Sequence, residues 1–435
     1  MSLHLPAAAA HTFEYAAKFL VIVICQYFIV NSYSIAVYGQ FSLIISCLAI
    51  GVSLVGLGQD PQLQNHILKT GGKDREIIVS ITILRYLVLM LMVFIGFILL
   101  FVVNIDSFIK NYFIQIIFYL TFEIFLIGYR IYFVSLMKYL QVAFISIVQL
   151  VAVTTGFVLI ISPESELSDF VWIFCLGRAV AAICFLLLYY KQTSFKINFI
   201  TLSDLRWIKS GLPILISGIT ANLYFYQDQW MLGVFSGDDE LGNYSLVSNF
   251  LIYFSILAVT FMNVQWSSIL MKKFSCKTGL RAAFVGLYSN AFIFSIFLFA
   301  SATVLSFVYF IILFEVENLI ILLALLGSYL LFSSFSALEN KILTLANKPS
   351  VIMWRVFFGL AINFGLNLIL LPRFGGVGAA VATLLSETLA FMAVSVIPGG
   401  KVVMVCRALW ARQFVKQYRI FIRKHGFKKD GNEIV

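Results

Sequence analysis

The chain has 435 residues, of which 61% are hydrophobic and only 11% are charged. Soluble domains are about half apolar and about a quarter charged, so this composition excludes an ordinary soluble protein. The formal net charge of +10 then has to be explained within a membrane protein rather than by a soluble partner.

The hydrophobic residues form repeated runs long enough to cross roughly 30 Å of hydrocarbon as helices. Inside lipid the backbone polar groups of each segment must pair within it, so continuous runs of this length predict helices rather than barrel strands. Residues 1–13 have no basic region typical of a secretory signal, and we expect a short soluble leader there. In chain order the twelve predicted spans are 14–34, 38–58, 77–103, 112–133, 142–162, 170–190, 211–234, 243–271, 282–313, 319–340, 351–371 and 377–398.

Lysine and arginine residues fall almost entirely on one side of these spans. All but five of the 30 lie in alternate connections or in the tail, and the opposite loops carry acidic residues instead. The positive-inside rule therefore places both termini in the cytoplasm, and an even number of spans requires the same. The basic tail is expected to lie on anionic lipid rather than on nucleic acid. The five exceptions are Lys18, Arg85, Lys110, Arg178 and Arg373.

Sequence motifs for catalysis or for metal binding are absent. None of the six cysteines forms a C-x-x-C pair, and the four histidines all lie outside the predicted spans. The sequence contains no phosphate-binding loop, no G-x-S-x-G turn and no H-E-x-x-H stretch. We expect no enzyme activity, no metal site and no cofactor.

Two strings in the second half echo the first half. YGQFSL at 38–43 matches LGNYSL at 241–246, and residues 176–178 align with 385–387 at nearly the same offset. With six spans in each half, this pattern predicts an all-α membrane protein built as a parallel repeat of two six-helix bundles. The expected domains are 1–198 and 199–398 for the bundles, and 399–435 for the basic cytoplasmic tail.

Charged residues inside the spans need a reason, because one at mid-bilayer costs about 2.5–3.5 kcal/mol on insertion scales. Arg178 and Glu387 lie near mid-span at equivalent repeat positions, so they either face a wet cavity or pair with each other. Lys18 and Glu339 lie near span ends, where snorkelling would suffice. The charges that we single out are Lys18, Arg85, Glu123, Arg178, Asp228, Glu339 and Glu387.

The cationic members of this set lie in the first half of the chain. Lys18, Arg85 and Arg178 together predict a cavity for an anionic group such as phosphate or pyrophosphate. The carboxylates Asp228, Glu387 and Glu123 would either exchange protons or sodium, since burial raises the pKa of a carboxyl group, or serve as static counter-ions.

Three groups of residues resemble the signatures of polysaccharide-export flippases of the Wzx type. These proteins belong to the multidrug/oligosaccharidyl-lipid/polysaccharide (MOP) exporter superfamily, and with twelve spans the resemblance covers nearly the whole chain. The groups are Tyr38-Gly39-Gln40-Phe41-Ser42; Gly211, Pro213, Asp228, Gln229, Gly242, Tyr244 and Ser245; and Asn363, Asn367, residues 371–380 and Glu387.

The resemblance implies a MATE-like fold and alternating access. The implied cargo is a polyprenyl-pyrophosphate-linked oligosaccharide, such as an O-antigen unit, flipped across the cell inner membrane. Arg85 and Arg178 would then meet the pyrophosphate, and the partners would be membrane lipids, a polysaccharide polymerase and chain-length machinery. Physical reasoning gives Gly375, Gly376 and Gly378 a tight turn with close helix approach, and places Pro213 in a first helical turn.

Several alternatives remain open at this stage. A cation-coupled multidrug exporter of the same superfamily is the main one, although members of that group usually carry a proline in the first span and residues 14–34 have none. A flippase for the peptidoglycan precursor would usually have fourteen spans. A membrane glycan polymerase would usually have larger loops.

Overall fold

The computed structural model describes residues 4–71, 76–102, 107–162, 165–192, 202–273 and 277–425, and within these ranges every regular element is a helix. The first eight helices are α1 (His4–Ser32), α2 (Ile35–Gly56), α3 (Asp60–Thr70), α4 (Glu76–Val102), α5 (Ser107–Ser135), α6 (Tyr139–Ile160), α7 (Leu167–Gln192) and α8 (Leu202–Phe235). They are followed by α9 (Asp238–Lys273), α10 (Lys277–Leu313), α11 (Leu319–Ser328), α12 (Leu330–Leu345), α13 (Pro349–Ala393) and α14 (Lys401–His425).

Ten of the described helical segments are long and apolar enough to cross a membrane. They agree in position with the predicted spans except at two places. The 45 residues of α13 cover the last two predicted spans, and α8 is not among the ten, because its middle carries polar residues such as Asn222, Gln227 and Asp228. The chain is therefore an all-α polytopic membrane protein, and the count of twelve spans stays a prediction.

A glycine divides α13 into two helical parts. Gly375 has a φ of 52° and a ψ of −134°, outside the helical region. A Cβ at this position would come within 2.6 Å of the Glu240 carboxylate, and the N–H of Gly376 donates to Glu240 Oε2 at 2.7 Å. The predicted tight turn with close helix approach at these glycines is thus what the structure has, since only glycine fits both the φ and the space.

One local expectation needs correction. Pro213 lies well inside α8 rather than in a first turn, because the helix begins earlier, at Leu202. The first apolar membrane-spanning segment starts at Phe13, close to the predicted residue 14, and α1 itself begins at His4. The soluble leader stays a prediction.

The chain forms two compact units. Unit 1 comprises residues 1–253, 306–322 and 360–382, and unit 2 comprises residues 254–305, 323–359 and 383–435. These units are defined by spatial contact and pass through α9, α10, α11 and α13. The division of the sequence into two six-helix bundles at residue 198 stays a prediction.

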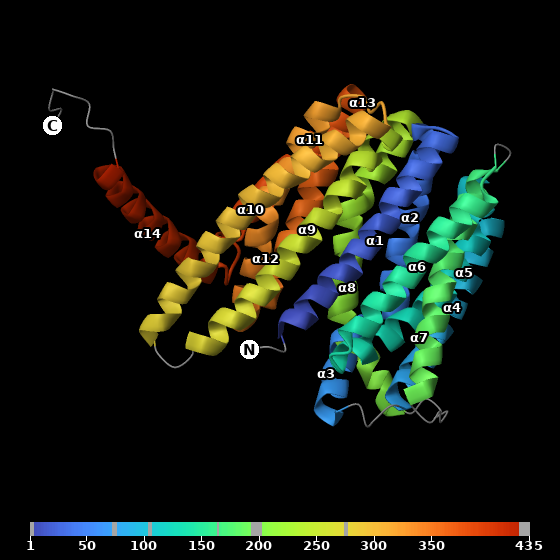
Figure 1. Ribbon diagram of the computed structural model, residues 1–435, viewed down its shortest axis with the longest axis horizontal. Coiled ribbons are helices and arrows are strands. Elements are labelled where there is room, and N and C mark those ends of the chain that lie inside the picture. Colours follow the sequence, from blue (N-terminus) through green and yellow to red (C-terminus); the bar gives the residue numbers. More distant parts are fainter. Residues whose placement is uncertain are drawn as a thin grey trace. The chain divides into compact units, whose positions relative to one another are not determined.

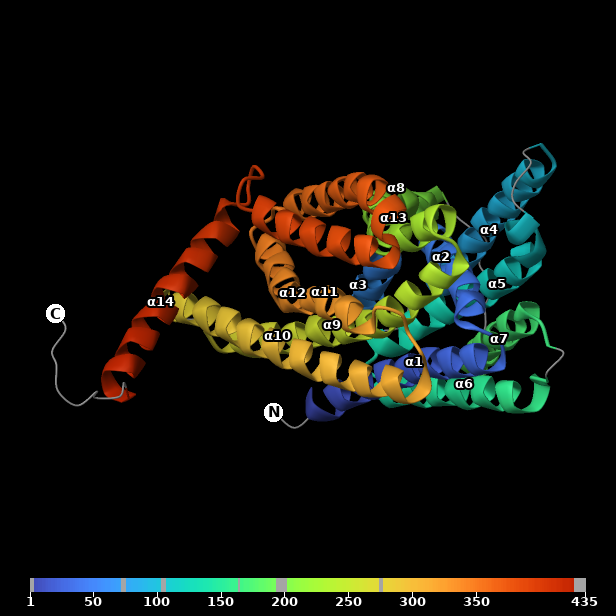
Figure 2. The same cartoon turned by 90° about the horizontal axis from the view of Figure 1, so that it is seen from above.

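Unit 1 is built on the mutual packing of its N-terminal helices. α1 packs on α6, α7 packs on both α5 and α6, and α2 packs on α5 and α8, as Figures 1 and 2 show. A cluster of buried aromatic residues that includes Tyr129, Tyr132, Phe133, Phe185 and Tyr189 joins α5 to α7. In lipid such close packing replaces the hydrophobic effect as the force between helices.

The two repeated strings contact each other inside unit 1. A Cβ on Gly39 would lie 2.7 Å from the carbonyl oxygen of Asp238 and 2.8 Å from the backbone nitrogen of Gly242. The missing side chains let α2 and the start of α9 cross in close contact. Around the crossing, Asn249 Nδ2 donates to the hydroxyls of Tyr38, at 3.1 Å, and Ser42, at 3.0 Å. The repeated motif therefore forms the close crossing between α2 and α9.

Unit 2 has its own buried cluster, to which the C-terminal helix belongs. Leu287, Tyr288 and Leu338 pack with Val403 of α14, and Trp410 of α14 donates its ring N–H to Ser289 Oγ at 3.2 Å. The predicted basic tail is thus helical from Lys401 to His425, and residues between Val403 and Phe414 attach it to the rest of unit 2.

Candidate functional site

A cavity of about 350 Å³ lies within unit 1. This volume is in the range of small-molecule binding sites, which run from about 300 to about 1,000 Å³. Residues from seven helices line it, from α1 and α2 and from α5 to α9. They include the charged groups Lys18, Glu123 and Arg178, the polar groups Ser53, Gln149 and Asn222, and the aromatic rings of Tyr119, Phe174, Tyr226 and Tyr253.

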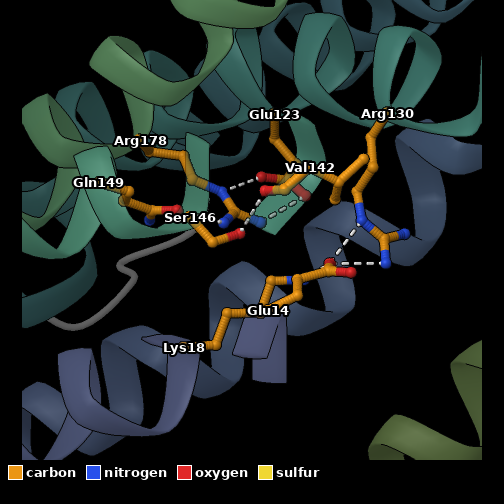
Figure 3. Close-up of polar contacts among 8 residues, drawn as sticks. All are labelled: Glu14, Lys18, Glu123, Arg130, Val142, Ser146, Gln149 and Arg178. Atoms are coloured by element: carbon orange, nitrogen blue, oxygen red, sulfur yellow. Dashed lines mark hydrogen bonds and ion pairs between the residues drawn. The ribbon is translucent and has the colours of Figure 1, made fainter. Parts of the chain in front are cut away.

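Arg178 and Glu123 form a two-pronged ion pair on the wall of the cavity (Figure 3). Arg178 Nη2 donates to Glu123 Oε1 at 2.8 Å, and Nε donates to Oε2. Nη1 reaches Gln149 Oε1 at 3.4 Å, and the guanidinium carbon lies 5.5 Å from the centre of the Tyr119 ring. The Glu123 side chain is only 5% exposed, so the arginine neutralises a carboxylate that burial would otherwise make costly.

Lys18 belongs to a second ionic group that shares one carboxylate oxygen. Lys18 Nζ lies 2.6 Å from Glu14 Oε1, and both Nε and Nη2 of Arg130 lie 2.7 Å from the same oxygen (Figure 3). Glu14 is buried, whereas the Lys18 side chain is 28% exposed and lines the cavity. The cavity wall therefore carries two cationic side chains, each next to a buried carboxylate.

The α2 and α8 side of the cavity is uncharged: α2 contributes mainly apolar side chains, and Ser53, Asn222 and Tyr226 supply its polar groups. Asn222 Nδ2 donates to the carbonyl oxygen of Ala49 at 3.0 Å and to Ser53 Oγ at 2.7 Å. The rings of Tyr226 and Tyr253 also line the cavity. Amide, hydroxyl and aromatic groups of this kind can both hydrogen-bond a polar ligand and stack against it.

A separate polar cluster surrounds Asp228 on α8. Its carboxylate accepts from Asn367 Nδ2 at 2.5 Å and from the Tyr244 hydroxyl at 2.7 Å. Asn367 also donates to Asn363 Oδ1 at 2.8 Å, and Gln227 donates to the same oxygen. Asp228 is 2% exposed and is not among the residues that line the cavity.

Comparisons with known proteins decide the family. The model of the family described as "Polysaccharide biosynthesis protein" matches residues 7–266, which is more than half of the chain. The chain belongs to this family. A search of curated protein sequences found no match.

Solved structures show the fold of this polysaccharide biosynthesis family member. Lipid II flippase MurJ in an inward closed conformation has a TM-score of 0.67 at 12% identity, and the match covers 99% of this chain and 94% of that one. A MOP-superfamily transporter from Pyrococcus furiosus has a TM-score of 0.64 at 10% identity, covering 94% and 96%. An outward-facing MATE transporter has a TM-score of 0.62 at 11% identity, covering 93% and 96%. The predicted MATE-like fold is confirmed, and the three solved structures are two transporters and a flippase.

The structure brings together some of the site residues predicted for this family member. Lys18, Glu123 and Arg178 meet on the cavity in unit 1. Arg85 does not line that cavity: its side chain is fully buried, and Nη2 contacts Asp60 Oδ1 at 2.5 Å and the Gly56 carbonyl oxygen at 3.3 Å. The functional roles of all these residues stay predictions.

The carboxylates predicted for the second half are bound in other ways. Glu123, in unit 1, pairs with Arg178. Glu387, in unit 2, accepts from Ser336 Oγ at 3.5 Å. Glu339 does not snorkel, since it is fully buried and pairs with Arg407 of α14 at 2.7 Å. Within the described residues, no group of three or more His, Cys, Asp or Glu could hold a metal ion.

Sequence reasoning missed Glu14, Arg130 and Gln149. Arg130 was counted among the cytoplasmic connections, yet it bonds to Glu14, from which it is 116 positions away. Glu14 lies at the start of a predicted span, where a carboxylate can reach the membrane surface and needs no buried partner. The one available signal was the i, i+4 spacing of Glu14 and Lys18, which predicts a helix-surface pair.

Proposed function

We propose that this protein flips a polyprenyl-pyrophosphate-linked oligosaccharide, an O-antigen unit or similar surface-polysaccharide unit, across the cytoplasmic membrane by alternating access. The observation that carries the proposal is the cavity of unit 1, which combines the cations Lys18 and Arg178 with amide, hydroxyl and tyrosine groups. The family match and the MOP-type fold support it.

The two chemistries of the cavity suit the two parts of such a head group. A pyrophosphate needs positive charge and N–H donors, and cationic side chains on the cavity wall can supply both. Sugars present hydroxyl groups and apolar faces, which Asn222, Ser53 and the tyrosine rings can bind and stack against. The polyprenyl chain would stay in lipid while the head group crosses.

Asp228 is the carboxylate that we assign to energy coupling. Its burial and its neutral hydrogen-bond donors, Asn367 and Tyr244, suit a group that alternately binds and releases a proton or a sodium ion. Glu123 then serves as the counter-ion of Arg178. Glu387 is the other candidate for coupling, and replacing each carboxylate by its amide would separate the two roles.

The proposal includes a location and an orientation. The protein would lie in the inner membrane with both termini in the cytoplasm, because the basic residues of the sequence are concentrated on that side. Its working partners would be membrane lipids and the polymerase and chain-length machinery that use the flipped unit. Reporter fusions after Lys73 and Lys277 should read inside, and fusions after Glu166 and Asp239 outside.

Deleting the gene tests the cargo. Loss of the flippase should remove surface polysaccharide while lipid-linked units accumulate on the cytoplasmic leaflet. A multidrug exporter of the same superfamily predicts the opposite pattern, with unchanged surface polysaccharide and raised sensitivity to cationic dyes. That pattern would refute the proposed cargo.

A further inference from the structure

The two cations on the cavity wall are held to different extents. Arg178 engages both oxygens of Glu123 and also reaches Gln149. Lys18 contacts one oxygen of Glu14 at 2.6 Å. A planar guanidinium held at two oxygens is fixed in position, whereas an ammonium group on a four-carbon stem can turn while its helix stays in place.

Lys18 and Arg130 share one oxygen atom of the Glu14 carboxylate. Its Oε1 atom lies within 2.7 Å of Nε and Nη2 of Arg130 as well as 2.6 Å from Lys18 Nζ. One carboxylate oxygen has two lone pairs, so three N–H groups cannot all bond to it well. The Lys18 contact joins residues one helical turn apart and involves a single carboxylate oxygen. Arg130 can therefore satisfy Glu14 when Lys18 leaves.

The balance of charges in the cluster also favours movement of Lys18 over movement of Arg178. Its cations are Lys18, Arg130 and Arg178, and its carboxylates are Glu14 and Glu123 (Figure 3). Turning Lys18 towards a ligand leaves Glu14 paired with Arg130. Turning Arg178 away would leave the buried Glu123 without its guanidinium, which is strongly unfavourable.

We infer that Lys18 is the residue that contacts the anionic phosphate group of the ligand, passing from Glu14 to that group, and that Arg178 is a positioning residue. Lys18 is the more exposed of the two, at 28% against 15% for Arg178. Its flexible stem lets the charge follow a head group that moves during transport. The inference rests on the proposed function, because it assumes an anionic cargo in this cavity.

Binding of undecaprenyl pyrophosphate to the purified full-length protein in detergent tests the inference. Lys18→Gln should weaken binding by about tenfold, and Lys18→Arg by no more than about threefold, because the positive charge is kept. Lys69→Gln, which removes an exposed lysine on α3, is the matched control and should bind as the wild type does. Inorganic pyrophosphate should compete in the wild type and much less in Lys18→Gln, which shows that the head group is what Lys18 contacts.

A change at Glu14 gives a result of opposite sign. Glu14→Gln removes the competing carboxylate, so binding should become about threefold tighter. If that variant unfolds at a lower temperature, the double variant Glu14→Gln/Arg130→Gln, which removes both partners of an ion pair, carries the same test. A merely structural role for Lys18 would not tighten binding in either variant.

The outcomes separate the inference from the proposed function. Wild-type binding that is unchanged in Lys18→Gln would overturn the inference and leave the flippase proposal standing. Weaker binding in Arg178→Lys than in Lys18→Gln, at equal thermal stability, would also overturn it. Absence of binding in the wild type, together with normal surface polysaccharide in the deletion strain, would reject the flippase proposal itself.

Discussion

Two arginine–glutamate pairs in this protein share their chemistry and differ in their surroundings. In unit 1, Arg178 grips Glu123 on the wall of a cavity. In unit 2, Arg407 grips Glu339 through Nε and Nη2, each at 2.7 Å, beside the hydrophobic cluster that attaches α14. Both carboxylates are buried, and in both pairs an aromatic ring lies near the guanidinium.

The surroundings decide what each pair can do. Arg178 has Gln149 and Lys18 on the same cavity, so a polar ligand can reach its neighbourhood. Arg407 instead donates to the carbonyl oxygen of Phe391 at 2.9 Å and lies 3.7 Å from the centre of that ring. A buried ion pair in a membrane protein is therefore not by itself evidence of a ligand-binding site. The second pair is best understood as the attachment of a helix.

The largest expected effect comes from Arg178→Ala. The change leaves Glu123 buried without its partner, which costs about 3–5 kcal/mol, and so both membrane abundance and polysaccharide export should fall sharply. Quantitative immunoblots of membranes and staining of surface polysaccharide measure the two separately. The double variant Arg178→Ala/Glu123→Gln should recover abundance. Full export at normal abundance in the single variant would show that Arg178 has no role in transport, and that the two ion pairs do not differ in this respect.

Arg407→Ala should also lower abundance, by a similar mechanism, because Glu339 is fully buried. The Arg407 side chain is 20% exposed, so water can partly replace it beside Glu339. We therefore expect the change to lower the stability of the protein by about 3 kcal/mol. Export per molecule of protein should stay at the wild-type level, unlike that of Arg178→Ala. Glu339→Gln in the same chain should restore thermal stability. A drop in export per molecule would show that unit 2's pair takes part in transport.

The smallest effects are expected from replacing the aromatic rings that lie near the two arginines. Phe391→Leu removes a ring 3.7 Å from the guanidinium carbon of Arg407, whereas Tyr119 lies 5.5 Å from that of Arg178. A cation–π contact contributes about 1 kcal/mol, so Phe391→Leu should lower the unfolding temperature slightly and leave export intact. Tyr119→Leu should instead reduce export, because that ring lines the cavity. Equal effects of the two changes on export would contradict the distinction.

The sequence by itself determined the membrane class, the positions of most spans and many of the charges that lie within them. These follow from local properties: the length of an apolar run, the distribution of lysine and arginine, and the cost of a charge in lipid. It also indicated that Gly375 and Gly376 make a tight turn, because glycine is the residue that tolerates such a backbone.

Only the tertiary structure decided how those charges are paired. Arg178 is paired with Glu123, 55 positions away, and Arg85 is paired with Asp60, outside the cavity. Glu14 and Arg130 are 116 positions apart, and Arg407 comes from beyond the last predicted span. A buried charge requires a partner, which the sequence can predict, but the identity of that partner depends on the rotation and crossing of whole helices.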